Sequence, residues 1–447
     1  MKHIRFSLLL LALLVAGIPA LAGNDKTAPS DDRNDPVAVP LKKEIVKSGW
    51  NLGLMPAVSY NNDLGFSAGA FAQVFDYGDG TVYPNYRHKL TANVNIYSRG
   101  AKQMWTEYDS KYLIPGYRVT AKLSFMDNPL CGFYGFNGAV SPYHADLDLR
   151  KAADGSEGIA FYSVHQRLFS ASLDLQGRLA DGLTWIGGAM YSWQRYDDVA
   201  FRVYDGKESL FHQYVENGLI AGGDTRGHRV ELKGGLVYDS RDFETNPERG
   251  LFATVTATGG AGITGGVRPS LVLSADFRQY LPLWPGRLTL AWQAAYKGLV
   301  AGSLPFYALP AYSMRGSFST RIIGNGVAWG SADLRLRIAS FQALKQNVEL
   351  GLVGFVDAGA VVQPYKLEQQ SALGSVVIDK TLDGQAVGLY ASIYDSLIAT
   401  RDRLHTSVGG GFWFALNRNF LVAMELGRPL NPQDGSLGIY VNMGFSF

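Results

Sequence analysis

The sequence predicts an all-β fold: a transmembrane, antiparallel β-barrel of about 16 strands with a long loop folded into the lumen. Three observations favour this class. The chain begins with an apparent export signal, and no later segment has both the length and the apolar composition of a spanning helix. Alternating aromatic and glycine-rich stretches run through the remainder, with Gly 52, Tyr 24 and Phe 23. Export together with β structure indicates the outer membrane of a Gram-negative bacterium.

Residues 1–22 are typical of a secretory signal peptide. Lys2 and Arg5 precede the apolar run FSLLLLALLVAGIP (6–19), and ALA (20–22) offers small residues for cleavage. The polar, proline-containing residues 23–49 are expected to form a flexible periplasmic segment, which either plugs the lumen or binds a periplasmic partner protein. The segment is too short for an independent periplasmic domain.

Charge and cysteine content exclude some classes of function. Lys+Arg 41 nearly balance Asp+Glu 39, which gives no indication of nucleic-acid binding. Cys131 is the only cysteine, so it cannot form an internal disulfide, and a small packing residue is the simplest interpretation.

Strict alternation identifies the strands. In ADLRLRI (332–338), Asp333 and Arg335 alternate with leucines, and LGIYVNMGFSF (437–447) places six apolar residues on one face. A soluble sandwich would bury the leucines, whereas a barrel turns them to lipid and lines its interior with the charges. The length of the terminal segment favours the barrel, which we expect over residues 50–447.

Sixteen strands can be placed, and their connections alternate between long loops and short turns, as outer-membrane barrels require. Residues 160–180 are interpreted as one strand, although two are possible. The strands are predicted at 50–60, 64–76, 86–98, 103–114, 117–127, 160–180, 184–198, 227–240, 250–261, 270–281, 287–302, 328–340, 346–359, 405–416, 420–428 and 436–447.

Four stretches resemble the barrel of the bacterial surface-antigen superfamily, the BamA/TamA-like assembly factors and their two-partner-secretion relatives. They are LVYDSRDFETNPERGLFATVTATGG (236–260), YSMRGSF (312–318), GSADLRLRI (330–338) and GFVDAG (354–359), with NPLCGFYGFNG (128–138) as a weaker fifth. Their order and strand positions agree with the family. The chain departs from it in having no evident periplasmic receptor domains and in placing Ser317, not an aromatic residue, after the Arg-Gly pair.

The resemblance implies that the loop after the eleventh strand enters the lumen and is held there by Arg315. Its expected partners are Asp333 and Asp357, which alternation turns inward, and Gly316 would let the backbone approach the wall. Arginine suits the role because its planar fork binds carboxylates bidentately and stays charged. The alternative is that Arg315 is a solvated loop charge without a partner.

The terminal aromatics Phe445 and Phe447 have two interpretations. They resemble the signal by which outer-membrane barrels are recognised for assembly, and Phe447 would also fit the aromatic girdle at the membrane interface. Both can hold together.

The chain is not expected to be an enzyme. No Gly-x-Ser-x-Gly turn is present, and the histidines form no metal-ligand pattern, so no cofactor, metal or catalytic residue is predicted. The expected partners are outer-membrane lipids and unfolded outer-membrane or secreted clients.

The predicted function is assistance of outer-membrane protein assembly or protein translocation through a weak seam between the first and last strands, where Gly53 and Pro56 fall in the first strand. The alternatives are a plugged pore for solutes and a structural or adhesive surface protein.

Overall fold

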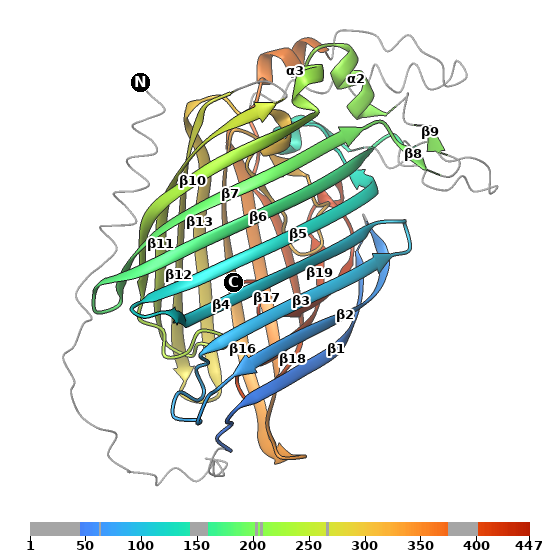
Figure 1. Cartoon of the computed structure of the whole chain (residues 1–447). Coiled ribbons are helices and arrows are strands. Elements are labelled where there is room, and N and C mark those ends of the chain that lie inside the picture. The colour runs from blue at the N-terminus through green and yellow to red at the C-terminus, as the bar shows by residue number, and fades with distance from the viewer. Residues whose placement is uncertain are drawn as a thin grey trace. The chain divides into compact units, whose positions relative to one another are not determined.

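The computed structural model describes residues 45–61, 64–143, 160–201, 204–205, 209–264, 268–373 and 401–447. Sixteen strands in this part of the chain form one closed, antiparallel barrel (Figure 1). The predicted fold class and strand number are therefore confirmed. Residues 1–22, predicted as the signal peptide, and residues 23–44 of the predicted periplasmic segment lie outside the described residues.

The barrel strands follow the chain order around the barrel. They are β1 (Trp50–Asn61), β2 (Gly65–Asp76), β3 (His88–Tyr97), β4 (Lys102–Ile114), β5 (Tyr117–Gly132), β6 (Ser163–Ala180), β7 (Leu183–Asp197), β10 (Arg226–Asp239), β11 (Gly250–Thr264), β12 (Ser270–Trp284), β13 (Leu288–Gly302), β16 (Gly326–Ala343), β17 (Gln346–Gln363), β18 (His405–Leu416), β19 (Phe420–Pro429) and β20 (Gly438–Met443).

Three strand predictions differ from the structure by four or more residues at one end. β17 continues to Gln363, beyond the predicted end at residue 359. β5 continues to Gly132, beyond the predicted end at residue 127, because a register shift between Asn128 and Cys131 accommodates Pro129 and lets the chain pair again with β6. β20 ends at Met443, whereas the prediction continued to residue 447. Residues 160–180 contain one strand, β6, as predicted.

The alternation places leucines outside and charges inside. Leu232 and Leu334 are exposed on the outer face, whereas Asp333 and Arg335 are buried in the lumen. This is the arrangement that lipid on one side and a polar lumen on the other require. Among the described helices, none is long and apolar enough to cross a bilayer.

The connections differ between the two ends of the barrel. The longest loops lie at one end, the loop end (Figure 1, top), and most connections at the other, the turn end, are short. The exceptions at the turn end are the β2–β3 and β10–β11 connections, residues 77–87 and 240–249. The loop end contains helices α2 (Leu210–Glu216) and α3 (Leu367–Leu373) and the short strand pairs β8–β9 (Ala200–Phe201, Tyr204–Asp205) and β14–β15 (Ala311–Tyr312, Ile322–Ile323).

An aromatic cluster packs the long loops together at the loop end. The ring of Phe133 contacts those of Phe211, Tyr214 and Phe306, each with centroids 5.4 to 5.7 Å apart and nearly perpendicular. Such edge-to-face pairs are favoured by the charge distribution of the rings. Residues from the β5–β6, β7–β10 and β13–β16 loops thus share one core at this end of the barrel.

Candidate functional site: an inward loop and a seam

The β13–β16 loop, residues 303–325, carries Arg315 against the inner wall. The Arg315 guanidinium donates to both carboxylate oxygens of Asp357, at 2.9 and 2.6 Å, and to Asp333 at 2.9 Å. It also donates to Glu425 at 2.6 Å. The structure thus places Arg315 beside both carboxylates that the family motif suggested, and it adds Glu425, which the sequence analysis missed.

The Arg315 site is dry and densely charged. Arg315 is 6% exposed, and the side chains of its three carboxylate partners are at most 3% exposed. Its guanidinium also lies 3.4 Å from the ring centre of Phe355. Asp333 is shared with Arg335, 2.9 Å away. In so little solvent, removing one charge leaves its partners uncompensated, which is far more costly than breaking a surface pair.

Gly316 brings the loop backbone into contact with the wall. Its φ is +91°, and a Cβ there would lie 2.6 Å from the carbonyl oxygen of Gly427 on β19. Its N–H donates to the Tyr440 hydroxyl at 2.7 Å. Both the left-handed conformation and the absence of space for a side chain require glycine at this position.

Ser317, which departs from the family motif, closes the turn. Its hydroxyl donates to the carbonyl of Met314 at 2.9 Å. The next residue supplies the aromatic ring, because Phe318 stacks on Tyr134 with centroids 4.4 Å apart. The ring is therefore shifted by one position and anchors the loop to the aromatic cluster.

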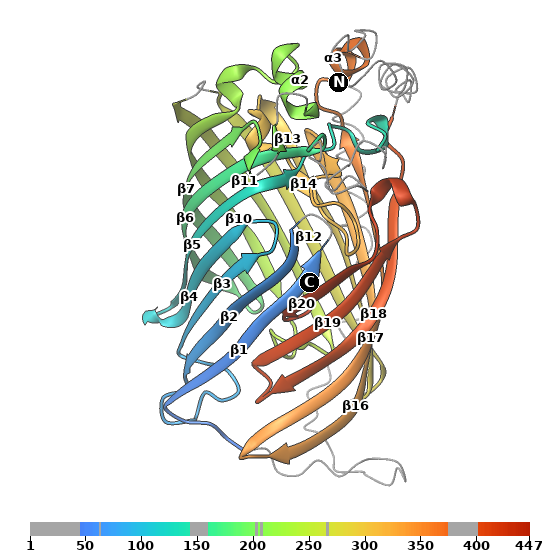
Figure 2. The same cartoon turned by 90° about the vertical axis from the view of Figure 1, so that its right-hand side faces the viewer.

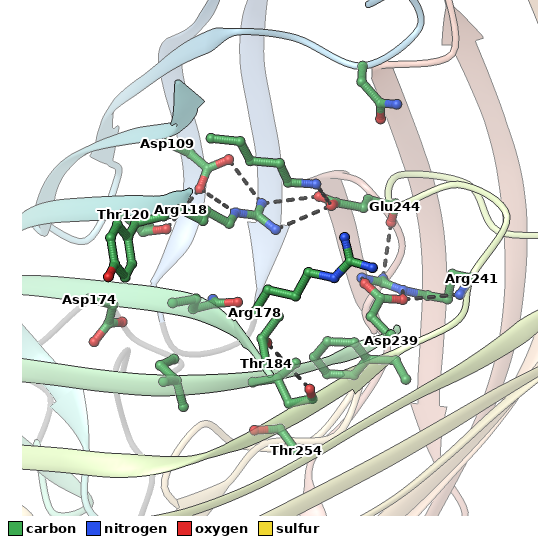
Figure 3. A pocket seen from close by; sticks show the side chains of 18 of the residues that line it. Asp109, Arg118, Thr120, Asp174, Arg178, Thr184, Asp239, Arg241, Glu244 and Thr254 are labelled. Carbon is green, nitrogen blue, oxygen red and sulfur yellow. Dashed lines mark hydrogen bonds and ion pairs between the residues drawn. The ribbon is translucent and has the colours of Figure 1, made fainter. Parts of the chain in front are cut away.

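A second segment enters the lumen from the turn end. The β10–β11 turn, residues 240–249, extends Glu244 to Lys111 at 2.6 Å and to Arg118 at 3.1 and 3.2 Å. Arg118 in turn binds Asp109 at 2.8 and 2.9 Å (Figure 3). These residues line a cavity of about 910 Å³.

The charges around Glu244 set its protonation. Burial raises the pKa of this carboxyl, but the neighbouring cations Arg118 and Lys111 outweigh burial and lower it to about 2. Glu244 is therefore ionised at neutral pH.

The boundary between β1 and β20, here called the seam, is the weakest junction of the barrel. Within these two described strands the register contains one pair, Tyr60 with Ile439. In contrast, β1 and β2 pair from Trp50–Asp76 to Asn61–Gly65. Figure 2 shows the ribbon of β1 separating from those of the C-terminal strands towards the turn end, where side chains and not backbone pairs fill the junction. Most of this edge of β1 therefore lacks a partner in β20.

In the half of the seam nearer the turn end, apolar side chains of β19 pack against the inner faces of β1 and β2 and close the junction. Phe420 and Val422 lie on the same face of β19 as the exposed Leu426, yet both are buried against Met55 and Phe71 on the inner faces of β1 and β2. A Cβ added at Gly53 would lie 2.4 Å from the Phe420 ring. The C-terminal edge of the barrel is thus tucked inside its N-terminal edge.

The end of the chain also turns inward, which corrects one prediction. Gly444 has a φ of +84°, and the residues after it leave the strand. Phe447 is buried against Tyr280 and Ala291, and Arg335 lies 3.8 Å from the ring centre of Phe445. The girdle position suggested for Phe447 is therefore wrong, because the backbone turns at Gly444. The assembly-signal role of Phe445 and Phe447 stays a prediction.

Three comparisons bear on this architecture. The family model described as the Omp85 superfamily domain matches residues 85–447. CdiB from Escherichia coli superimposes with a TM-score of 0.50 at 11% identity, covering 88% of this chain and 62% of that one. BamA from Haemophilus ducreyi lacking POTRA domains 1–3 superimposes with a TM-score of 0.49 at 14% identity, covering 89% of this chain and 70% of that one. No curated protein sequence matches the chain.

Proposed function

Because the chain belongs to the Omp85 superfamily, we propose that its barrel assists the assembly of outer-membrane proteins or the translocation of proteins, and that the seam is the working part. The protein is an outer-membrane β-barrel of a Gram-negative bacterium. Its clients are unfolded outer-membrane or secreted proteins, which a periplasmic partner delivers.

The observation that carries the proposal is the unpaired edge of β1. An exposed strand edge presents a row of backbone donors and acceptors, to which another strand adds by antiparallel pairing. Inside a bilayer this edge cannot be satisfied by water, so a partner strand is strongly favoured there. A client strand would displace the apolar overlap of Phe420 and Val422 and pair with β1.

The Arg315 loop supports the seam in this proposal. It contacts β17 through Asp357, β19 through Glu425 and β20 through Tyr440. The contacts with Asp357 and Glu425 are buried. The loop therefore holds three of the four strands β17–β20 that precede the seam. Arg315, Gly316, Asp333 and Asp357 therefore act as a loop pin, and catalysis has no part in the mechanism.

A disulfide across the seam tests the proposal. Gly53→Cys with Phe420→Cys, in a Cys131→Ala background, joins β1 to β19 at a point where an added Cβ at Gly53 lies 2.4 Å from the Phe420 ring. Proteoliposomes with the purified barrel should accelerate folding of a small, urea-denatured outer-membrane barrel when the bond is reduced. Oxidation should abolish this acceleration.

The matched control bond is Val94→Cys with Met104→Cys, which joins paired, exposed positions of β3 and β4 away from the seam. It should leave the acceleration intact under both conditions. Full acceleration with the seam bond closed would refute the proposed mechanism.

A plugged pore is the second candidate, favoured by the cavity of about 910 Å³ in the turn-end half of the lumen. The aromatic cluster and the inward loop pack the other half. Planar-bilayer recordings separate the two candidates: a solute pore gives large, steady openings, and a plugged assembly barrel gives small, flickering ones.

A further inference from the structure

The seam is bridged at the turn end by contacts between turns. The Asn419 side chain, after β18, donates to the Tyr77 hydroxyl at 3.0 Å and to the carbonyl of Pro84, both in the β2–β3 turn. In a regular barrel β19 and β2 are separated by two strands, or about 14 Å at the usual spacing. These hydrogen bonds therefore exist only because the C-terminal edge is tucked inside.

Both sides of this contact are held rigidly. Tyr77 stacks on Phe75 with ring centres 5.8 Å apart and contacts the edge of Tyr83 at 5.4 Å. On the other side, Asn347 of β17 donates its backbone N–H to the Asn417 side chain at 3.0 Å. Asn347 also reaches across the seam, donating to the Tyr83 hydroxyl at 3.3 Å.

Asn347 also holds the segment that leads into β1. Its amide accepts a hydrogen bond from the N–H of Ile45 at 3.0 Å and donates one to the carbonyl of Ile45 at 2.9 Å. Lys47 adds a bond to the carbonyl of Lys345 at 2.6 Å. The residues before β1 thus pass across the turn end of the seam. The Asn347 side chain of β17 binds both Ile45 in this segment and Tyr83 on the opposite side of the seam.

We propose that Asn347 and Asn419 form a clasp that limits opening of the seam at the turn end, and that movement of residues 45–49 releases the clasp through Ile45. The inference deepens the proposed function by naming its control, but the opening is measured without any client. Tyr77 and Tyr83 are the partners on the opposite side of the seam.

The experiment measures the width of the seam by pulsed electron paramagnetic resonance in nanodiscs. Spin labels at Leu52→Cys and Phe412→Cys, both exposed on the outer face, report the separation of the two edges in a Cys131→Ala background. Asn419→Ala and Asn347→Ala should each add a population at longer distance, with the larger population in Asn347→Ala.

Asn51→Ala is the matched control. The Asn51 amide donates to the carbonyls of Ser48 and Gly49, on its own side of the seam. Its distance distribution should equal that of the parent. Identical distributions for Asn419→Ala, Asn347→Ala and Asn51→Ala, in barrels that keep their heat-modifiable gel mobility, would overturn the clasp.

Ile45→Pro tests the coupling to the preceding segment, because proline removes the N–H that Asn347 accepts. A longer distance in this variant supports the coupling, and an unchanged distance refutes it. A clasp variant that widens the seam without altering client folding would count against the proposed function and leave the clasp standing. Conversely, if closing the Gly53→Cys/Phe420→Cys disulfide abolishes the acceleration of client folding but the clasp variants do not widen the seam, the proposed function stands and the clasp is refuted.

Discussion

Two segments enter the lumen from opposite ends of the barrel, and they are held by opposite charges. The β13–β16 loop brings the cation Arg315 to three carboxylates, whereas the β10–β11 turn brings the anion Glu244 to two cations. Arg315 is 6% exposed, while Glu244 is 29% exposed and its partners Lys111 and Arg118 are 47% and 24% exposed.

The difference in solvent exposure, more than the number of hydrogen bonds, separates the two sites. A buried ion pair loses its water on folding, so removal of one partner leaves a charge that nothing else solvates. In a solvent-exposed ion pair, water can solvate the charge that remains when its partner is removed. The Arg315 loop should therefore behave as a fixed part of the barrel and the Glu244 turn as a readily displaced one.

The largest effect is expected for Arg315→Ala. Three carboxylates would share a dry site with Arg335 as their remaining cation, so the free energy of unfolding should fall by ~3–5 kcal/mol. The midpoint of heat-modifiable gel mobility measures this change, and the loop should become sensitive to protease. Adding Asp357→Asn should recover part of the loss, because it removes one of the uncompensated charges. Wild-type behaviour of Arg315→Ala would refute the pin.

A smaller effect is expected for Gly316→Ala. The left-handed backbone alone costs ~1–3 kcal/mol for a residue with a side chain, and the contact with Gly427 adds to it. Gly116→Ala is the control, since Gly116 has a φ of +83° but nothing within 4 Å of the added Cβ. The difference between the two thermal midpoints measures the cost of the contact between the added Cβ and the Gly427 carbonyl. Equal midpoints would show that the loop backbone moves away from β19 without cost.

Glu244→Gln should lower the free energy of unfolding by less than Arg315→Ala does, because water can replace part of the lost ionic contacts. Hydrogen exchange should nevertheless increase in residues 240–249, because the turn loses the ionic contacts of Glu244 with Lys111 and Arg118. Asp181→Asn is the comparison, since it removes an ion pair with Arg178 on an exposed turn. A thermal shift as large as that of Arg315→Ala would remove the distinction between the two sites.

The smallest effect concerns pH. The folded-state pKa of Glu244 is about 2, below its ordinary value of 4.5, so its contribution to stability is present above pH 4.5 and is lost as the pH falls towards 2. Hydrogen exchange of residues 240–249 should therefore be the same at pH 7 and pH 5 and should rise below pH 4.5. A rise already at pH 6 would contradict the assigned ion pairs.

Alternation could predict most of the fold because lipid and lumen impose opposite polarity on successive residues. The family motif suggested Asp333 and Asp357 as partners of Arg315. Glu425 was missed, although a single acid in the apolar strand FLVAMELG (420–427) was a usable signal. Glu244 lies in a recognised motif, but no spacing rule indicates that it crosses the lumen.

The overlap at the seam could not be predicted from the sequence. Phe420 and Val422 satisfy the pattern of a lipid-facing strand, and the pattern is the same whether they meet acyl chains or the inner face of β1. The inward turn at Gly444 was hidden for the same reason, since the alternation continues to residue 447 while the backbone does not.

The tucked edge gives the barrel a circumference that can change at low cost. When β19 slides outward, Phe420, Val422 and Met424 exchange protein neighbours for acyl chains, and acyl chains are as apolar as the side chains they replace. The hydrophobic effect therefore favours neither position strongly. The circumference of the barrel is therefore set by a small number of polar contacts at the turn end, together with the thickness and order of the surrounding lipid.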